Sequence, residues 1–478
     1  LNAVLSQDEA ATVAGIAADD RQLATLCIRV AGEYGFKSAA KPLGELAQDE
    51  PDPDRLMELL TALARIRSAE SLPVFRTFLD HDDPFVAALA MEFIGRMADT
   101  ESIPALKAAI EANEAPDRYE ECAITTWKAV EALALIADDA CLAFLVDKLH
   151  HKNPTARRLI TDALVTLGEA AIPHLEGALV GDDLDRRILA ANVLGFIRHK
   201  RGADVLVAAM DKGLVEDANL RYAVFEALGR IGTMKGIICL VDGLEETDEL
   251  ILMAVVGGLE RHVNPGMIKA VVLALGKGDE QAARLAKAMA SARAMKLFAA
   301  IYEDEAAADA VRAAVAVSRD PEVVGAFRSA LEELAAESGS DRPKEHIKAL
   351  PEVSAGARKA LAADDSRSMA ALHRAILTDL GFEPYVAANG EEAYSFVEVG
   401  HSFDIVVTDM NMPVMDGMEL VEKLRATEGF EAVPIIMVTT ESEGSQRDLA
   451  SKTGVSAFIT KPFKPEALSA KITELLKA

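Results

Sequence analysis

The sequence predicts a multi-domain chain in which an all-α solenoid precedes a doubly wound α/β domain with five parallel strands. Three observations predict it. The first two thirds of the chain repeat about every 31 residues, a fixed place holds Asp or Asn in eight of nine repeats, and the chain after residue 357 alternates short apolar runs with helical periods. A length of 478 residues also exceeds what one ordinary hydrophobic core accommodates, so at least two units are expected.

The repeat is clearest at a landmark position that usually holds a small residue. The landmarks are Gly32, Ala64, Gly95, Ala134, Val165, Gly195, Gly229, Glu260 and Ser291. Twelve residues before them stand Asp20, Asp52, Asp83, Cys122, Asn153, Asp183, Asp217, Asp248 and Asp279. Asp and Asn cap helix N-termini because their side chains accept backbone N–H bonds. Each repeat is therefore expected to be a capped helix, a turn and a second helix, often with proline in its first turn, as at Pro73, Pro104 and Pro173.

Helix pairs of this length bury their apolar faces by stacking on one another, which gives a solenoid. The spacing resembles HEAT repeats, and the Ala-Leu-Gly-x-Ile-Gly segment that ends at Gly232 resembles the subtype named after phycobiliprotein lyases. The resemblance covers residues 10–302, and residues 303–336 resemble a closing helix pair. We expect a HEAT-type solenoid of about nine to ten repeats over 1–336. A linker over 337–356 follows, where Ser338–Pro343 is polar and turn-rich.

Charged side chains within the array allow two interpretations. Arg157, Arg187 and Arg221 occupy the same place in three consecutive repeats. They form either an anion-binding stripe or a ladder in which each guanidinium bonds carbonyls or carboxylates of a neighbouring repeat. His150–His151 is a weak metal candidate because no third ligand follows at the usual spacing. Trp127 lies in an apolar helical segment and is expected in the core.

Beyond residue 357 the pattern becomes one of alternating strands and helices. Strands are expected at 359–363, 384–388, 404–408, 434–438 and 457–460, and helices at 369–380, 391–399, 417–425, 445–452 and 465–477. Such alternation predicts a parallel sheet covered on both faces. Ligands bind to sheets of this kind outside the carboxyl ends of the strands, where the strand order reverses.

Polar side chains stand at four of these strand ends. Asp364 and Asp365 follow the first strand, Asp409 the third, Thr439 the fourth and Lys461 the fifth. Three carboxylates that converge repel one another, so they take up protons or bind a hard cation. Oxygen ligands with room for water suit Mg²⁺. The sequence therefore predicts a magnesium site that also binds a phosphoryl group.

This part of the chain resembles the receiver domain of two-component response regulators, especially the single-domain chemotaxis receivers (CheY-like). The resemblance spans 357–478 and is carried by Asp409–Gly417, Pro434–Thr439 and Lys461-Pro462-Phe463. It implies the flavodoxin-like form of the doubly wound fold. It also implies that Asp409 accepts a phosphoryl group from a cognate histidine kinase, with Lys461 neutralising charge on the transferring group.

The same resemblance implies roles for the surrounding residues. Mg²⁺ is bound by Asp365, Asp409 and the backbone carbonyl of Asn411, and Asp364 assists through water or hydrogen bonds. Thr439 bonds a phosphoryl oxygen, and Phe458 then changes rotamer, which is the switch of the family. A cis peptide is expected before Pro462.

Variable positions beside the site are expected to set the lifetime of phosphorylation. Asn411 and Glu441 match the chemotaxis receivers, which implies a comparatively short-lived phosphoryl group. Thr440 replaces the usual alanine, and its bulk is expected to slow the access of a phosphodonor. These two effects oppose each other.

The resemblance implies a bacterial phosphoacceptor signalling protein rather than an enzyme, with at most its own phosphoryl transfer and slow self-dephosphorylation. Its expected partners are a cognate histidine kinase and an unidentified protein on the HEAT surface, whose interactions phosphorylation modulates. Two alternatives stay open. The HEAT array has lyase-like or nucleic-acid-directed activity that the receiver regulates, or the receiver is a phosphate sink for a shared kinase.

The charge and cysteine content limit the classes of partner and the cellular environment that are expected. The net charge of −27 divides into −7 over residues 357–478 and −20 over the rest, which disfavours nucleic acid and anionic membrane as partners. The four cysteines, Cys27, Cys122, Cys141 and Cys239, are far apart and are expected to be free buried thiols in a reducing cytoplasm. No apolar run reaches transmembrane length, and no signal peptide is visible in a chain that begins at Leu1.

Overall fold

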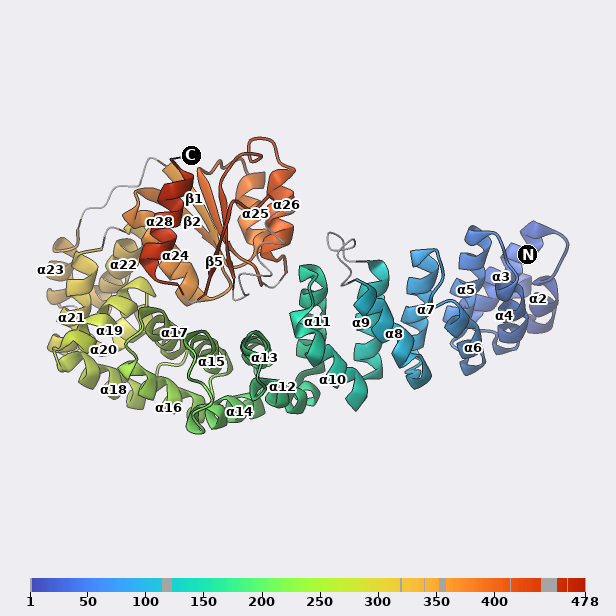
Figure 1. Ribbon diagram of the computed structural model, residues 1–478, viewed down its shortest axis with the longest axis horizontal. Helices are drawn as coiled ribbons and strands as arrows, with labels where there is room; N and C mark the ends of the chain where they lie inside the picture. Colours follow the sequence, from blue (N-terminus) through green and yellow to red (C-terminus); the bar gives the residue numbers. More distant parts are fainter. Residues whose placement is uncertain are drawn as a thin grey trace. The chain divides into compact units, whose positions relative to one another are not determined.

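The computed structural model describes residues 2–113, 123–318, 320–338, 340–351, 358–412, 414–439, 454–461 and 463–477. It consists of two compact units, Leu1–Ala171 and Ile172–Ala478. Figure 1 shows that the first unit is helical and that the second contains both helices and the sheet. The boundary between the units lies within the predicted repeat array.

The described part of the first unit is built from paired helices. They are α1 (Asn2–Leu5), α2 (Glu9–Gly15), α3 (Arg21–Tyr34), α4 (Ala40–Gln48), α5 (Pro53–Ile66), α6 (Leu72–Thr77), α7 (Pro84–Arg96), α8 (Ile103–Ala112), α9 (Ile124–Ile136), α10 (Asp139–Asp147) and α11 (Pro154–Leu167). Short 3-10 helices lie at Lys37–Ala39, Ala69–Ser71, Thr100–Ser102, Lys148–His150 and Gly168–Ala171.

The second unit continues the helix pairs before the chain enters the sheet. The helices are α12 (Ile172–Leu179), α13 (Leu184–Ile197), α14 (Lys200–Asp211), α15 (Ala218–Ile231), α16 (Met234–Asp242), α17 (Glu249–Glu260), α18 (Pro265–Gly276), α19 (Glu280–Ser291), α20 (Met295–Ile301), α21 (Glu305–Ala316), α22 (Pro321–Ser338) and α23 (Arg342–Lys348), with a 3-10 helix at Gly243–Glu245. Helix α23 falls within the predicted linker. There the Tyr302 hydroxyl lies 2.7 Å from His346 Nδ1, so this segment is held against the end of the array.

The predicted N-caps are confirmed at each of the eight described Asp and Asn positions. Their side chains accept backbone N–H bonds at the starts of α3, α5, α7, α11, α13, α15, α17 and α19. The ninth position, Cys122, lies outside the described residues. Asp304 caps α21 in the same way, which supports the predicted closing pair. A local signal in the sequence therefore marks where the first helix of each repeat begins.

The small landmark residues are explained by how closely the first helices of adjacent repeats approach. A methyl group at Gly95 of α7 would lie 2.5 Å from the Cα atom of Ala132 on α9. A methyl group at Gly229 of α15 would lie 2.6 Å from the Cα atom of Gly258 on α17. Real carbon atoms do not come so close, so these landmarks must be glycine for the backbones to pack as they do.

Two of the three aligned arginines form the predicted ladder. Arg187 donates from Nε to the carbonyl of Leu179 at 2.8 Å and also bonds the carbonyl of Leu214. Arg221 donates from Nε to Glu246 at 2.6 Å and from Nη1 to the carbonyl of Val215 at 3.2 Å. These guanidiniums bind the turns that join the helices, which supports the ladder over an anion-binding stripe at these two positions.

Other expectations for the array have mixed outcomes. Trp127 was expected in the core, but it is 46% exposed, and its indole donates to Glu131. The prediction was wrong because an apolar helix carries some large residues on its outer face. Cys27 and Cys141 are free and buried, whereas Cys239 is free and only partly buried. His151 Nε2 lies 3.1 Å from the carbonyl of Ile110 and its Nδ1 accepts a backbone N–H, so the ring has structural partners.

The α/β part of the second unit has the predicted five parallel strands. They are β1 (Arg358–Ala363), β2 (Phe382–Ala387), β3 (Ile405–Asp409), β4 (Ile435–Thr439) and β5 (Ala457–Thr460), in the order β2-β1-β3-β4-β5. Helices α24 (Arg367–Asp379) and α28 (Pro465–Leu475) cover one face, and α25 (Gly390–Glu398) and α26 (Gly417–Arg425) cover the other (Figure 1). The strand order reverses between β1 and β3, so a ligand site is expected there.

Apolar side chains fill both faces of this sheet, and a few others remain exposed elsewhere. All five residues of β3 and of β4 are buried, as expected for strands covered by helices on both sides.

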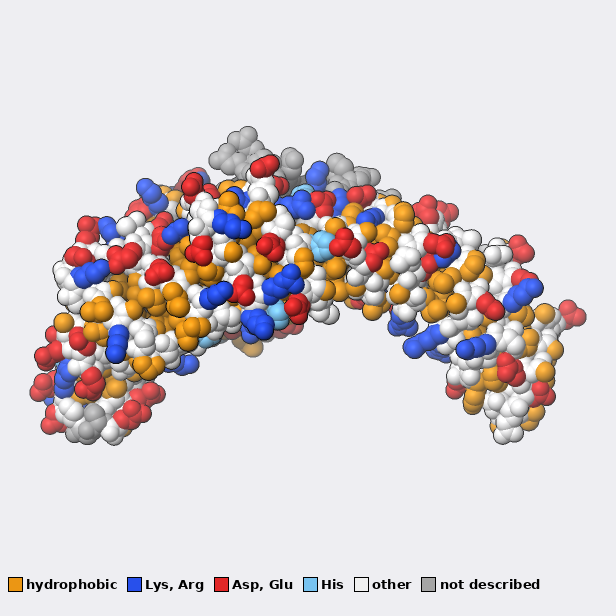
Figure 2. Space-filling view, turned by 90° about the horizontal axis from the view of Figure 1, so that it is seen from below, with side chains coloured by type: hydrophobic (Ala, Val, Ile, Leu, Met, Phe, Trp, Pro, Cys, Tyr) orange, Lys and Arg blue, Asp and Glu red, His pale blue; other side chains and the backbone are white. Residues whose placement is uncertain are grey.

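In the repeat array, Met234 and Ile238 on α16 and Leu273 on α18 are more than half exposed. Figure 2 shows hydrophobic, acidic and basic side chains interspersed on the face that it draws. Within the described parts of the chain, no helix has the length and apolarity needed to cross a bilayer.

Candidate functional site

The turn from β1 into α24 holds the first two carboxylates. The backbone N–H of Asp364 donates to the carbonyl of Ala387 at the end of β2, at 3.1 Å. Its carboxylate accepts the N–H of Ser366 at 2.9 Å. Ser366 in turn caps α24 by accepting the N–H of Met369. The chain therefore leaves the sheet abruptly, and Asp364 and Asp365 stay at its carboxyl edge.

The loop after β3 fixes Asp409. This residue is the last of β3 rather than the first after it, and its carboxylate accepts the backbone N–H of Met410 at 2.9 Å. Gly417 donates its N–H to the Met410 carbonyl at 3.0 Å, and a methyl group at Gly417 would lie 2.0 Å from the Asp409 carbonyl oxygen. Only glycine permits this return of the loop, which Asp416 completes with a capping box at the start of α26.

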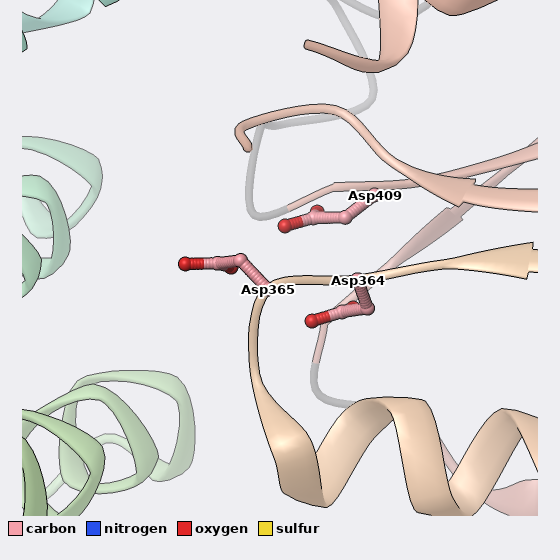
Figure 3. Close-up of side chains that lie close together, drawn as sticks. All are labelled: Asp364, Asp365 and Asp409. Carbon is pink, nitrogen blue, oxygen red and sulfur yellow. The ribbon is translucent and has the colours of Figure 1, made fainter. Parts of the chain in front are cut away.

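The three carboxylates converge as predicted. One oxygen from each of Asp364, Asp365 and Asp409 lies within 4.8 Å of the others, and this is the one such cluster of possible metal ligands found among the described residues. Figure 3 shows Asp409 above and Asp364 below the segment that leaves β1, and Asp365 extending away from the sheet. Lys461, which follows β5, lies 2.9 Å from Asp364 and 3.1 Å from Asp409 through its Nζ atom.

Burial and mutual repulsion shift the protonation of these groups. Burial raises the pKa of Asp409 to about 7, and Asp364 and Asp365 add to this rise while Lys461 opposes it. Burial likewise raises the pKa values of Asp364 and Asp365. Burial alone would lower the pKa of Lys461, but the three carboxylates raise it above its usual value. The site thus holds an excess of negative charge that a cation would stabilise.

The donor set suits a hard divalent cation. Three carboxylates at the carboxyl edge of the sheet supply oxygen ligands, which Mg²⁺ prefers. The predicted fourth ligand, the backbone carbonyl of Asn411, belongs to the same loop as Asp409 and stays a prediction.

Of the remaining predicted residues, the structure describes Thr439 and Phe458 but not those in the loops after β4 and β5. Thr439 is the last residue of β4, fully buried, and its hydroxyl lies 3.6 Å from Met410 Sδ beside Asp409. Phe458 lies on β5 opposite Met437 and is partly buried. Thr440, Glu441, Pro462 and the predicted helix 445–452 lie outside the described residues.

Two family matches identify the parts of the chain. Residues 360–473 match the family described as response regulator receiver domain, and residues 40–125 and 120–195 match the family described as HEAT repeats. A chemotaxis protein CheY homolog of Campylobacter jejuni is 40% identical over 119 residues, which cover 25% of this chain and 92% of that protein. The chain belongs to the response regulator receiver family. HEAT repeats precede its receiver domain.

Solved structures match the receiver domain as well. Chemotaxis response regulator CheY4 of Vibrio cholerae is 34% identical, covering 26% of this chain and 99% of that one, with a TM-score of 0.24. The receiver domain of sensor histidine kinase PA1611 of Pseudomonas aeruginosa, solved with magnesium in its active-site cleft, is 27% identical. That match covers 26% of this chain and 100% of the other, with a TM-score of 0.24.

Sequence reasoning missed a second set of residues, which the HEAT repeats bring to the receiver domain. Arg230 of α15 forms an ion pair with Asp365 through Nη2 and Oδ2 at 3.0 Å. Glu226 and Tyr222, on the same helix, bond Ser366. The available signal was the charged pair Glu226 and Arg230 in the otherwise apolar second half of α15, since a buried charge requires a partner. No feature of the sequence predicted that Asp365 is the partner of Arg230.

Proposed function

We propose that this chain is a two-component response regulator in which Asp409 accepts a phosphoryl group from a histidine kinase in a Mg²⁺-dependent reaction. The observation that carries the proposal is the convergence of Asp364, Asp365 and Asp409 with the ammonium of Lys461 at one edge of the sheet. Receiver domains are signalling phosphoacceptors, and this arrangement supplies the groups that such a transfer needs.

The reaction forms one bond and breaks one bond. An Asp409 oxygen attacks the phosphorus of a phosphohistidine, the P–N bond breaks, and the imidazole leaves with the bonding electrons and takes up a proton. Oδ1 of Asp409 accepts the Met410 N–H and faces Lys461, so we assign the attack to Oδ2. Asp409 must be ionised to attack, and the cations at the site favour that form.

The residues around Asp409 then have distinct roles. A Mg²⁺ ion held by Asp365, Asp409 and the Asn411 carbonyl would neutralise charge on the transferring group. Lys461 neutralises charge on the same group through the Nζ atom that lies near Asp364 and Asp409. Thr439 donates its hydroxyl to a phosphoryl oxygen of the product, which changes the packing around Phe458. A local change at the site thus alters the surface that other proteins meet.

The experiment that tests this proposal is labelling with acetyl phosphate, read by intact-protein mass spectrometry. We expect one added phosphoryl group in the presence of Mg²⁺ and none after chelation. Asp409→Ala abolishes the label, and Lys461→Ala slows labelling by about a hundredfold because one electrostatic contact to the transferring group is lost.

A matched control is Asp404→Asn, which changes an exposed aspartate just before the other end of β3 and leaves labelling unchanged. Persistent label on the Asp409→Ala variant would refute the assignment of the phosphoacceptor.

The output is proposed to be a change in the protein interactions of the HEAT repeats. The support is the direct contact between α15 and the metal-binding edge of the receiver domain. Affinity capture with and without beryllofluoride, which mimics a phosphoryl group, is expected to recover different partner proteins. Recovery of the same partners in both conditions would contradict this part of the proposal.

A further inference from the structure

The carboxyl edge of the receiver domain is covered by a helix of the HEAT array. Arg230 of α15 pairs with Asp365 at 3.0 Å, and the two side chains are only 11% and 13% exposed. The guanidinium also lies over the ring of Phe196, 4.5 Å from its centre. A cationic group of the array therefore occupies the position of a counter-ion at one of the predicted metal ligands.

Further polar contacts on α15 hold the start of α24. Glu226 is buried to 3% exposure, and it accepts hydrogen bonds from the hydroxyls of Ser366 at 3.1 Å and Ser368 at 3.2 Å. The Tyr222 hydroxyl bonds Ser366. A carboxylate buried in the array thus has receiver side chains as partners, so this face of α15 is complementary to the receiver edge.

We propose that α15 is a docking surface for the active-site edge of the receiver domain, and that Arg230 and Mg²⁺ compete for Asp365. The inference rests on the proposed function. A metal ion at Asp365 requires the carboxylate that the guanidinium now pairs with, and two cations on one carboxylate repel each other. Binding of Mg²⁺ therefore favours release of α15, and docking of α15 weakens the binding of Mg²⁺.

Docking also restricts the approach to the phosphoacceptor. With the array in place, Asp365 at this edge pairs with Arg230 and its side chain is only 13% exposed. A phosphohistidine must reach Asp409 from the carboxyl edge, which is the edge that α15 covers. The docked form is therefore the one that neither binds the cation well nor admits the phosphodonor.

Beside these polar contacts, the packing between the array and the receiver domain is incomplete. Helices α19, α21 and α24 leave a cleft of about 370 Å³ between them, lined mainly by alanines such as Ala286, Ala310 and Ala375. The surfaces of the array and the receiver domain therefore do not fill this cleft as the helices of a single core would. The polar contacts of α15, together with the packing of α17 on α24, hold the docked form, and their loss frees a surface that carries Tyr222, Glu226 and Arg230 for other proteins.

The test measures Mg²⁺ affinity by isothermal titration calorimetry in the full chain. Arg230→Ala should tighten Mg²⁺ binding by about tenfold, the scale of a typical coupling between sites. This variant also removes a positive charge, so a second variant is needed that keeps the charge. Gly257→Phe serves because a methyl group at Gly257 of α17 would meet only the Ser368 hydroxyl, at 3.2 Å, so a larger side chain wedges the receiver away. It should tighten Mg²⁺ binding too.

The matched control is Arg96→Ala in α7. Arg96 stands at the same place in its repeat as Arg230 and pairs with Glu92 as Arg230 pairs with Glu226, but it belongs to the first unit and its side chain is 52% exposed. Its Mg²⁺ affinity should equal that of the parent chain. If Gly257→Phe leaves the affinity unchanged, competition by docking is overturned, even when Arg230→Ala has an effect.

Acetyl phosphate labelling of the same variants separates this inference from the proposed function. Faster labelling of Arg230→Ala and Gly257→Phe than of the parent supports both. If these variants bind Mg²⁺ more tightly but none takes the label, docking stands and the phosphoacceptor function fails. If all variants label and bind Mg²⁺ as the parent does, the function stands and docking fails.

Discussion

Two repeats of this molecule carry the same charged pair and use it differently. In α7, Glu92 and Arg96 stand three residues before and one residue after the landmark glycine, and in α15 Glu226 and Arg230 stand at the same places. Arg96 bonds Glu92 at 2.6 Å on the surface and is 52% exposed. Arg230 is 11% exposed and pairs with Asp365 of the receiver domain.

The difference shows what the repeat determines and what its surroundings determine. The repeat fixes the position of each charge on the helix, because both pairs are separated by one helical turn. The neighbouring domain decides whether the charge is a solvated surface group or a buried ion pair. An exposed pair such as Glu92–Arg96 contributes little to stability, whereas a buried charge must keep its partner.

Both repeats have a landmark glycine at which the next helix approaches closely. Both glycines should therefore be equally sensitive to substitution. Gly95→Val and Gly229→Val each introduce a branched side chain where even a methyl group would lie 2.5 or 2.6 Å from the backbone of the next helix. We expect each to lower the free energy of unfolding by about 3 kcal/mol or more, at the upper end of overpacking costs. Urea denaturation followed by circular dichroism measures it.

Gly177→Val is the control for this packing prediction, because no other helix comes within 4 Å of a methyl group at Gly177 on α12. We expect little change in stability there. A large loss at Gly95 with none at Gly229 would mean that the two repeats are not packed alike.

Many helix starts and strand positions of this fold could be predicted from the sequence because the signals for them are local. The Asp and Asn caps predicted the starts of eight helices, since a cap acts within three residues of its own position. Buried strands were recognisable as short apolar runs, although β2 begins at Phe382, two residues before its predicted start. Asp409 and Thr439 were predicted just after their strands and are in fact the last strand residues.

The candidate site could be predicted only in part. The receiver motifs brought Asp364, Asp365, Asp409 and Lys461 together correctly, because strand ends of one parallel sheet meet at one edge. The ion pair between Arg230 and Asp365 joins residues 135 positions apart on different elements. No periodicity or spacing encodes such a contact, since it depends on how the surfaces of α15 and the receiver domain fit together.

The pH dependence of stability should have opposite signs in the two regions. The pKa of Asp409 is raised to about 7 by burial, above about 3.9 in an unfolded chain. The stability that its protonated form contributes is therefore present below about pH 4 and is lost as the pH rises through about 7. In the first unit, a hydrogen bond from Arg76 lowers the pKa of Asp99. The stability that the ionised Asp99 contributes is present above the pKa of Asp99 in the unfolded chain. It is lost as the pH falls through the lower pKa of Asp99 in the folded chain.

Asn substitutions isolate each contribution in metal-free buffer. Asp409→Asn should be more stable than the parent by about 2 kcal/mol at about pH 8 and equal to it at about pH 4. Asp99→Asn should be less stable than the parent at about pH 8, with the difference shrinking in acid. Calorimetric unfolding at several pH values gives both differences. Equal pH slopes for the two variants would contradict the assigned shifts.

The helix caps give the smallest expected effect and separate folding from docking. Asp83→Ala removes the cap of α7 and Asp217→Ala removes the cap of α15, where Asp217 accepts the N–H groups of Asn219 and Leu220. Each should lower the free energy of unfolding by about 1 kcal/mol, while Asn at either position should be nearly neutral. Arg230 lies near the other end of α15, more than three turns from the cap, so Asp217→Ala should leave Mg²⁺ affinity unchanged. If Mg²⁺ bound more tightly to Asp217→Ala than to Asp83→Ala, loosening of α15 alone would suffice to release the receiver edge. The docking would then depend on the rigidity of the whole helix as well as on its charged end.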